Sequence, residues 1–214
     1  MIFRRRTLLK GLLGVSGMLA QSFPSMAQKR TSTMYDDLTA GEIRMLLALQ
    51  PNATCGYVRE TFRSATNIAP GGLPAPFSGG RPLGSALYFM VTPDQHVKLH
   101  RIRNDQLYHY YLGDPLEVFL LHSGGAAERV VVGPDLRNRQ RVQLLIPGDT
   151  FHTAHVIGRR RWFLGASTEW PGVEPQDVEI GDLEKLAGAY PGAANAIRTI
   201  AAGRYQSLEE TEHS

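Results

Sequence analysis

Short runs rich in hydrophobic residues, separated by polar turn residues, fill most of the chain between residues 57 and 166. In residues 57–63 every second side chain is polar, as in a strand with one packed face. Further short runs separated by turn residues span 86–91, 96–102, 107–112, 116–122, 129–132, 140–146, 151–156 and 161–166. So many short strands at close spacing predict a mainly β protein, a sandwich or barrel.

Helical spacing is confined to the two ends of this region. Thr39 and Glu42 form a capping-box pattern, which predicts a helix near 39–49 that Pro51 ends. Apolar residues at helical spacing predict two C-terminal helices within roughly 182–203. Residues 69–84 hold five glycines and four prolines, which predict a loop.

The first 27 residues have the pattern of an export signal. Arg5-Arg6-Thr7-Leu8-Leu9-Lys10 resembles the twin-arginine motif, and an apolar run to Ala20 and a small-residue site follow. The apolar run is too short to span a bilayer. We therefore expect a signal peptide at 1–27, one domain at 28–214, a periplasmic location, and no stable membrane insertion after cleavage.

Composition narrows the classes of partner. The formal net charge of +3 comes from 23 basic and 20 acidic residues, and four of the basic residues lie in the leader, which leaves 19 against 20 and a net charge of −1. Nucleic-acid binding needs a patch of positive potential, so we expect no nucleic-acid partner. The single cysteine, Cys55, excludes an intrachain disulfide and a metal site built on several thiolates.

Two short motifs carry a family resemblance. Lys98-Leu99-His100 is followed by Gln106 and Gly113, and Pro147-Gly148-Asp149-Thr150-Phe151-His152 comes later. This arrangement resembles the cupin superfamily, whose first motif is H-x-H, three or four residues, E, six residues and G, and whose second is P-x-G-x-x-H.

Longer blocks at 51–64, 99–116, 132–136 and 190–197 resemble one RmlC-like cupin family of unknown function, the DUF985 type. The chain shares with it Gly56, Tyr57, Arg59, Glu60, Thr61, Arg63 and Ser64, then His100, Arg101, Asp105, His109, Tyr111, Gly113, Pro115 and Leu116. The resemblance implies a double-stranded β-helix, the cupin jelly-roll barrel, over roughly 57–180, with a pocket inside the barrel. It also implies a homodimer.

The departures from the family pattern bear on a metal. Asn52, Thr54, Cys55 and Gln106 stand where the family has histidine, glutamate, glycine and an acidic residue. The resemblance leaves His100, His152 and Gln106 as candidate ligands for one divalent transition metal, a weaker set than three histidines and a carboxylate. In the alternative reading, His100 and His152 hydrogen-bond within a polar barrel.

Metal-free proton transfer is the competing chemistry. Small-barrel epimerases use a histidine base and a tyrosine acid, and histidine titrates near neutrality. We take His100, Tyr108 and Tyr111 as candidate catalytic residues. Because alternate residues of a strand share a face, only one of Tyr108 and Tyr111 can face the pocket. The other interpretation of these tyrosines is aromatic packing.

The candidate ligand contacts are Arg59, Glu60, Gln106 and His109. An inward Arg59 would bind a carboxylate or phosphate, and the alternative is a structural ion pair. Glu169 and Trp170 follow the last expected strand; they are candidates for the barrel mouth, and a surface position is the default interpretation. We expect binding of a small polar metabolite of the sugar or keto-acid type, with isomerase- or epimerase-like chemistry. The alternatives are a metal-dependent dioxygenase or lyase and a non-catalytic binding protein.

Overall fold

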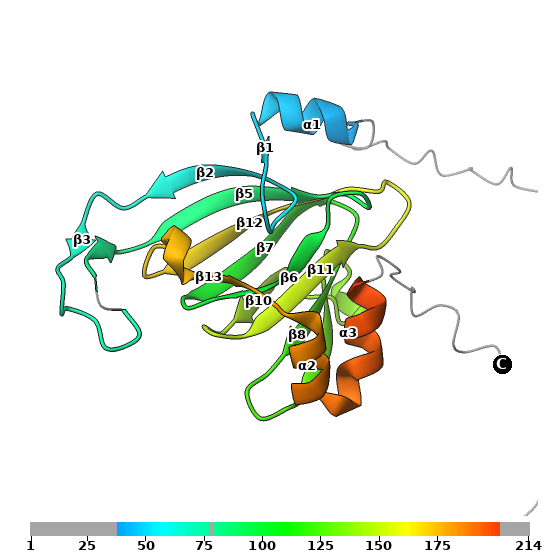
Figure 1. Cartoon of the computed structure of the whole chain (residues 1–214). Helices are drawn as coiled ribbons and strands as arrows, with labels where there is room; N and C mark the ends of the chain where they lie inside the picture. Colours follow the sequence, from blue (N-terminus) through cyan, green and yellow to red (C-terminus); the bar gives the residue numbers. More distant parts are fainter. Residues whose placement is uncertain (1–37, 78, 202–214) are drawn as a thin grey trace, which may run out of the picture. The chain divides into compact units, whose positions relative to one another are not determined.

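Two antiparallel β-sheets packed face to face form the centre of the protein (Figure 1). The computed structural model describes residues 38–77 and 79–201. All of them belong to the unit at residues 35–214; a second unit covers residues 1–34. The predicted signal peptide at 1–27 lies outside the described residues.

The first sheet has the strand order β1-β2-β5-β12-β7-β10. Its strands are β1 (Gln50–Pro51), β2 (Tyr57–Arg63), β5 (Ser85–Val91), β7 (Asp105–Gly113), β10 (Gln143–Ile146) and β12 (Phe163–Trp170). The second sheet has the order β13-β6-β11-β8-β9. It contains β6 (Val97–Ile102), β8 (Leu116–Leu121), β9 (Ala127–Val132), β11 (Phe151–Val156) and β13 (Val178–Ile180). This arrangement is the expected mainly β jelly roll.

An apolar core fills the space between the two sheets at one end. Its members are buried residues from both sheets, including Phe89, Leu116, Val118, Leu144 and Phe163. They come from alternate positions along each strand, so the alternation in the sequence is the packing pattern of the sandwich.

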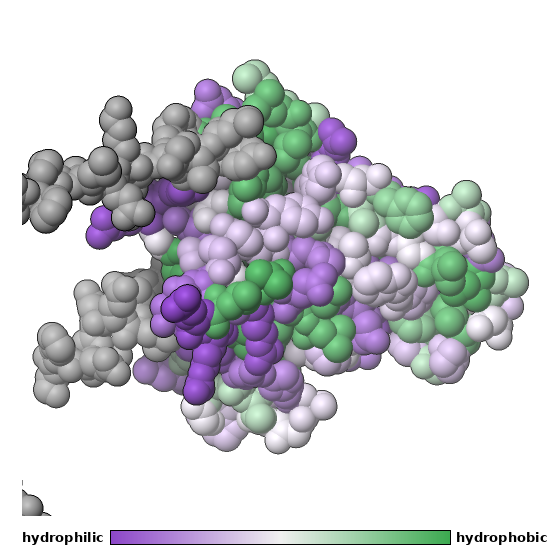
Figure 2. Space-filling view, turned by 180° about the vertical axis from the view of Figure 1, so that it is seen from behind, coloured by the Kyte–Doolittle hydropathy of each residue, from purple (hydrophilic) through white to green (hydrophobic). Residues whose placement is uncertain are grey.

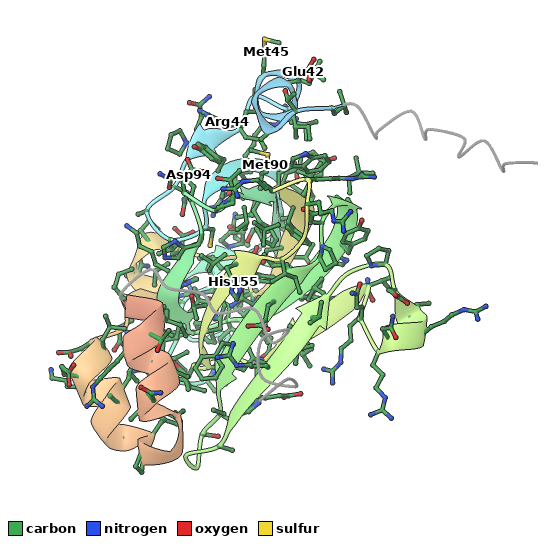
Figure 3. The ribbon with its side chains drawn as sticks, turned by 90° about the vertical axis from the view of Figure 1, so that its right-hand side faces the viewer. Glu42, Arg44, Met45, Met90, Asp94 and His155 are labelled. Atoms are coloured by element: carbon green, nitrogen blue, oxygen red, sulfur yellow. The ribbon has the colours of Figure 1, made fainter. Side chains whose placement is uncertain are left out.

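Helix α1 (Ala40–Leu46) covers part of the outer face of the first sheet. Thr39 and Glu42 form both hydrogen bonds of the capping box, as predicted. Ile43 packs with Met90, while Met45 points away from the strands and is 74% exposed (Figure 3). The helix ends earlier than the predicted boundary, because the chain turns at Ala48 (φ +52°) to enter β1.

Helices α2 (Leu183–Ala189) and α3 (Ala194–Ala201) cover the outer face of the second sheet. Leu186 and Ile197 pack against Leu99, Phe119 and Phe151. This confirms the two predicted C-terminal helices. Seen from behind, hydrophobic residues form separate patches among polar ones (Figure 2). Among the described residues, no helix is long and apolar enough to cross a membrane.

Three details differ from the pattern expected from the sequence. The glycine- and proline-rich segment contains β4 (Arg81–Pro82), which pairs with β3 (Asn67–Ile68). Strand β12 continues to Trp170 instead of ending near 166, and β13 is an additional strand. The 3-10 turn at Pro175–Asp177 leads into β13, and a buried ion pair joins it to β4: Arg81 Nη1 lies 2.7 Å from Asp177 Oδ2.

Candidate functional site

A cavity of about 340 Å³ opens between the two sheets at the end that the apolar core leaves unfilled. Its walls come from β2, β5, β7 and β12 of the first sheet and from β6 and β13 of the second. The turn before β13 contributes Glu174 and Pro175. A volume of this size is at the lower end of small-molecule sites.

A row of polar side chains crosses the first sheet inside this cavity. The strand register places Arg63 opposite Ser85, Ser85 opposite Glu169, and Glu169 opposite Gln106. All four line the cavity. Residues paired in this way project from the same face of a sheet, so four strands contribute one continuous polar strip.

Glu169 is the buried acid of this row. Glu169 is only 3% exposed, and Ser85 Oγ donates a hydrogen bond to its Oε2 over 2.7 Å. Burial raises the pKa of the Glu169 carboxyl, because an ionised carboxylate loses its hydration there. The carboxyl group is therefore suited to exchanging a proton with a bound molecule.

Two buried histidines lie side by side on the second sheet. His100 on β6 is directly opposite His152 on β11, and their ring centroids are 4.4 Å apart. His100 Nδ1 lies 2.8 Å from the carbonyl oxygen of Lys98, and His152 Nδ1 lies 3.2 Å from that of Thr150. A carbonyl only accepts hydrogen bonds, so each Nδ1 carries the proton and each Nε2 is a hydrogen-bond acceptor.

Burial lowers the pKa of both imidazoles, and for His152 the neighbouring His100 lowers it further. Both rings are therefore neutral at pH 7. Tyr108 Oη donates to His152 Nε2 over 3.0 Å, whereas His100 Nε2 lies 3.9 Å from Cys55 Sγ, and His100 is the histidine of the pair that lines the cavity. His100 is thus the available base.

Tyr108 and Cys55 are both neutral in this environment. Burial raises the pKa of the Tyr108 phenol well above its ordinary value, and burial raises the pKa of the Cys55 thiol to about 11. A phenol with such a pKa is a poor acid. The geometry gives Tyr108 the role of holding the His152 ring.

The loop before β2 presents Cys55 to the cavity. Asn52 Oδ1 accepts hydrogen bonds from the backbone N–H of Thr54 and of Cys55, at 2.9 and 3.0 Å. Asn52, which stands where the family has a histidine, therefore stabilises the loop that carries the cysteine. Gly56 follows at φ +66°, where a Cβ would come within 2.4 Å of the Met90 carbonyl oxygen.

The structure brings together some of the residues expected from the sequence. His100, Tyr108, Gln106 and Glu60 line the cavity, and His152 lies directly behind Tyr108. Lys98, next to His100 in the motif, has an exposed side chain.

Three expected site residues lie outside the cavity, on the outer face of the first sheet. His109 hydrogen-bonds to Thr168 and Gln143, and Tyr111 is 45% exposed and packs edge-on against Tyr88. Arg59 donates to the carbonyl of Leu47 in the chain after α1. Since alternate residues face opposite ways, the inward Tyr108 places His109 outside, and these three are not part of the candidate site.

Sequence reasoning missed Arg63 and took the surface as the default position of Glu169, which lines the cavity. The strict alternation in β2 puts Glu60 and Arg63 on opposite faces, but a bulge between Glu60 and Phe62 turns both toward the cavity. Glu169 is buried because β12 continues beyond its expected end. The signal that could have shown this is the alternation of Ser167 and Glu169 with Thr168 and Trp170.

The donor set does not fit a transition metal. The described residues contain no group of three or more histidine, cysteine, aspartate or glutamate side chains arranged to hold a metal ion. The Nε2 of His152 is occupied by Tyr108, and Gln106 offers a neutral amide in place of a carboxylate. Two histidines and a neutral amide lack the carboxylate or third histidine that is typical of transition-metal sites, so the expected ligands His100, His152 and Gln106 are a poor fit to such an ion.

A comparison with known families assigns the fold. The model of the cupin superfamily family DUF985 matches residues 42–181. The chain belongs to this family. A hypothetical protein from Leishmania major is 25% identical, with a TM-score of 0.70 over 76% of this chain and 98% of that one. A protein from Shewanella oneidensis is 22% identical, with a TM-score of 0.65 over 75% and 96%. No curated protein matches the chain.

Proposed function

We propose that this cupin binds a small polar metabolite of the sugar or keto-acid type in its cavity and transfers a proton on it, as isomerases and epimerases do. One observation carries the proposal. A neutral imidazole acceptor, His100, and a buried carboxyl of raised pKa, Glu169, line one cavity from opposite sheets. Two groups whose pKa values are shifted toward each other suit acid–base chemistry near neutral pH.

The proton balance of such a step is simple. His100 Nε2 accepts the proton of a carbon atom beside a carbonyl group, and Glu169 delivers a proton from the other side of the bound molecule. Solvent then restores both groups to their starting protonation states. In this scheme Tyr108 and His152 do not exchange protons with the ligand. Tyr108 holds the His152 ring, which packs against the ring of His100.

Deuterium exchange tests the proposal directly. The purified chain is incubated in D₂O with a panel of aldoses, ketoses and keto acids, and NMR records exchange at the carbon next to the carbonyl. We expect His100→Gln and Glu169→Gln each to slow exchange by roughly a hundredfold or more. His109→Gln is the matched control, because this histidine is outside the cavity, and it should exchange at the wild-type rate.

The same experiment separates the alternatives. Exchange that disappears on treatment with a chelator would establish a metal-dependent enzyme and refute the proposal. Ligand-raised thermal stability without exchange of any proton would establish a non-catalytic binding protein.

We also propose that residues 1–27 export the protein to the periplasm by the twin-arginine route. The support is the sequence Arg5-Arg6-Thr7-Leu8-Leu9-Lys10. Substituting lysine for both Arg5 and Arg6 should move the protein from the periplasmic to the cytoplasmic fraction. An unchanged distribution would contradict this route.

A further inference from the structure

Arg63 is the one cationic side chain among the described residues that line the cavity, and it is already bound to carboxylates. Arg63 Nε lies 3.2 and 3.1 Å from the two carboxylate oxygens of Glu60, and its Nη2 lies 2.9 Å from Glu60 Oε2. Its Nη1 donates to Glu174 Oε1 over 3.1 Å, and Nη2 also donates to the carbonyl of Val173. All three guanidinium nitrogens therefore have protein acceptors.

This pairing removes Arg63 as an anchor for an anion. The hydrogen bond that Arg63 donates to Glu60 is the main cause that raises the pKa of Arg63, so the guanidinium keeps its charge. A carboxylate or phosphate that entered the cavity would have to displace Glu60 or Glu174. The Nε and Nη2 donors of Arg63 already bind Glu60, so this side of the guanidinium has no pair of donors available for a second bidentate partner.

The remaining charge in the cavity is negative. The described lining residues include three carboxylic acids, Glu60, Glu169 and Glu174, against the single cation Arg63, while the lining His100 is neutral. The side chains of Glu60 and Glu174 are 49% and 29% exposed, so solvent screens part of their charge, whereas Glu169 is buried. The excess of carboxylates over cations in the lining therefore disfavours an anionic ligand, and more so when Glu169 is ionised.

An unpaired polar group shows what the cavity does accept. Gln106 is 4% exposed and lines the cavity, and no described residue hydrogen-bonds to its side-chain amide. The amide of Gln106 is available to a molecule in the cavity, and one amide supplies both a donor and an acceptor. A hydroxyl group is also both donor and acceptor, so it matches Gln106.

We propose that the cavity selects an uncharged polyhydroxylated molecule of monosaccharide size and rejects its phosphorylated or carboxylated forms. The inference rests on the proposed binding function and narrows it to the sugar class. Gln106 and Ser85 contact hydroxyl groups, and the Glu60–Arg63–Glu174 cluster excludes anions.

Isothermal titration of the purified protein with matched sugars tests the inference. Glucose and galactose are compared with glucose 6-phosphate and galacturonate, and with other neutral monosaccharides and their acids. We expect a neutral sugar to bind at least roughly tenfold more tightly than its own anionic form. Tighter binding of the anionic form would overturn the inference and leave the binding function intact, whereas binding of no sugar or acid would overturn both.

A gain of function gives an independent measurement. Glu60→Gln releases the bidentate partner of Arg63, so the variant should bind the anionic sugars more tightly than the wild type does, by roughly tenfold. Glu128→Gln removes one acid from β9, outside the cavity, and should leave the ratio of neutral to anionic affinity unchanged. An equal ratio in Glu60→Gln and wild type would refute the role of the Glu60–Arg63 pair.

Discussion

The Tyr108–His152 hydrogen bond predicts a large difference between two tyrosine substitutions on the same strand. Tyr108 and His152 are 1% and 0% exposed, and the Oη to Nε2 distance is 3.0 Å. Tyr108→Phe retains the ring but removes the only donor that reaches this nitrogen among the described residues. Because water cannot replace the donor at a fully buried atom, the cost is that of an unsatisfied acceptor, about 1–3 kcal/mol.

Tyr111→Phe is the matched control. It removes the same atom from the same strand, but Tyr111 is 45% exposed on the outer face. Water then replaces any lost contact, and the expected change in the free energy of unfolding is within about 0.5 kcal/mol.

Urea denaturation at pH 7.5 measures both variants, with thermal melting as a second readout. For a domain of this size each kcal/mol corresponds to roughly 2–4 °C, so Tyr108→Phe should melt roughly 2–12 °C lower than wild type. The ¹⁵N shifts of His152 should identify Nδ1 as the protonated nitrogen. Equal stability of the two variants, or a proton on Nε2 of His152, would refute the arrangement of the histidine pair.

Three further predictions concern titrating groups. Burial raises the pKa of Glu169, so ionisation above its unfolded-state pKa costs folding free energy, and Glu169→Gln should become progressively more stable than wild type as pH rises from 4 to 8 in urea denaturation. The pKa of His155 falls to about 4 through burial first, so this group should contribute a loss of about 3 kcal/mol of stability between pH 6.5 and 4, and His155→Gln should lose correspondingly less stability than wild type over that range. With a pKa of about 11, the Cys55 thiol is ionised in only about one molecule in a thousand at pH 8, so a disulfide reagent should label it slowly in the native protein and rapidly in guanidinium.

The sequence predicted the strands and helices well because their signals are local. The capping box at Thr39 and Glu42 and the short apolar runs that form β5 and β8 depend on neighbours only a few residues away. The sequence could not reveal the bulge in β2 or the extension of β12. Both depend on how distant strands pair, and the bulge alone decides that Arg63 joins Glu60 inside the cavity.

The candidate site likewise has residues that the sequence located and residues that it did not. The cupin motif located His100 and His152. The alternation of side chains along a strand showed that either Tyr108, or His109 and Tyr111, face the pocket, but a single sequence could not decide between them. The choice follows from the apolar core, because Tyr108 shares its face of β7 with residues that pack between the sheets.

The two ends of the β-sandwich bury residues of different kinds. The end filled by Phe89, Leu116 and Phe163 is apolar and supplies the burial that stabilises the fold. The other end buries Glu169, Gln106 and the two histidines, which are costly to desolvate and do not improve packing. A protein that retains such a row across four strands departs from the pattern that would maximise stability, and departures of this kind mark functional sites. The polar end of the barrel is therefore the place where its chemistry should be sought.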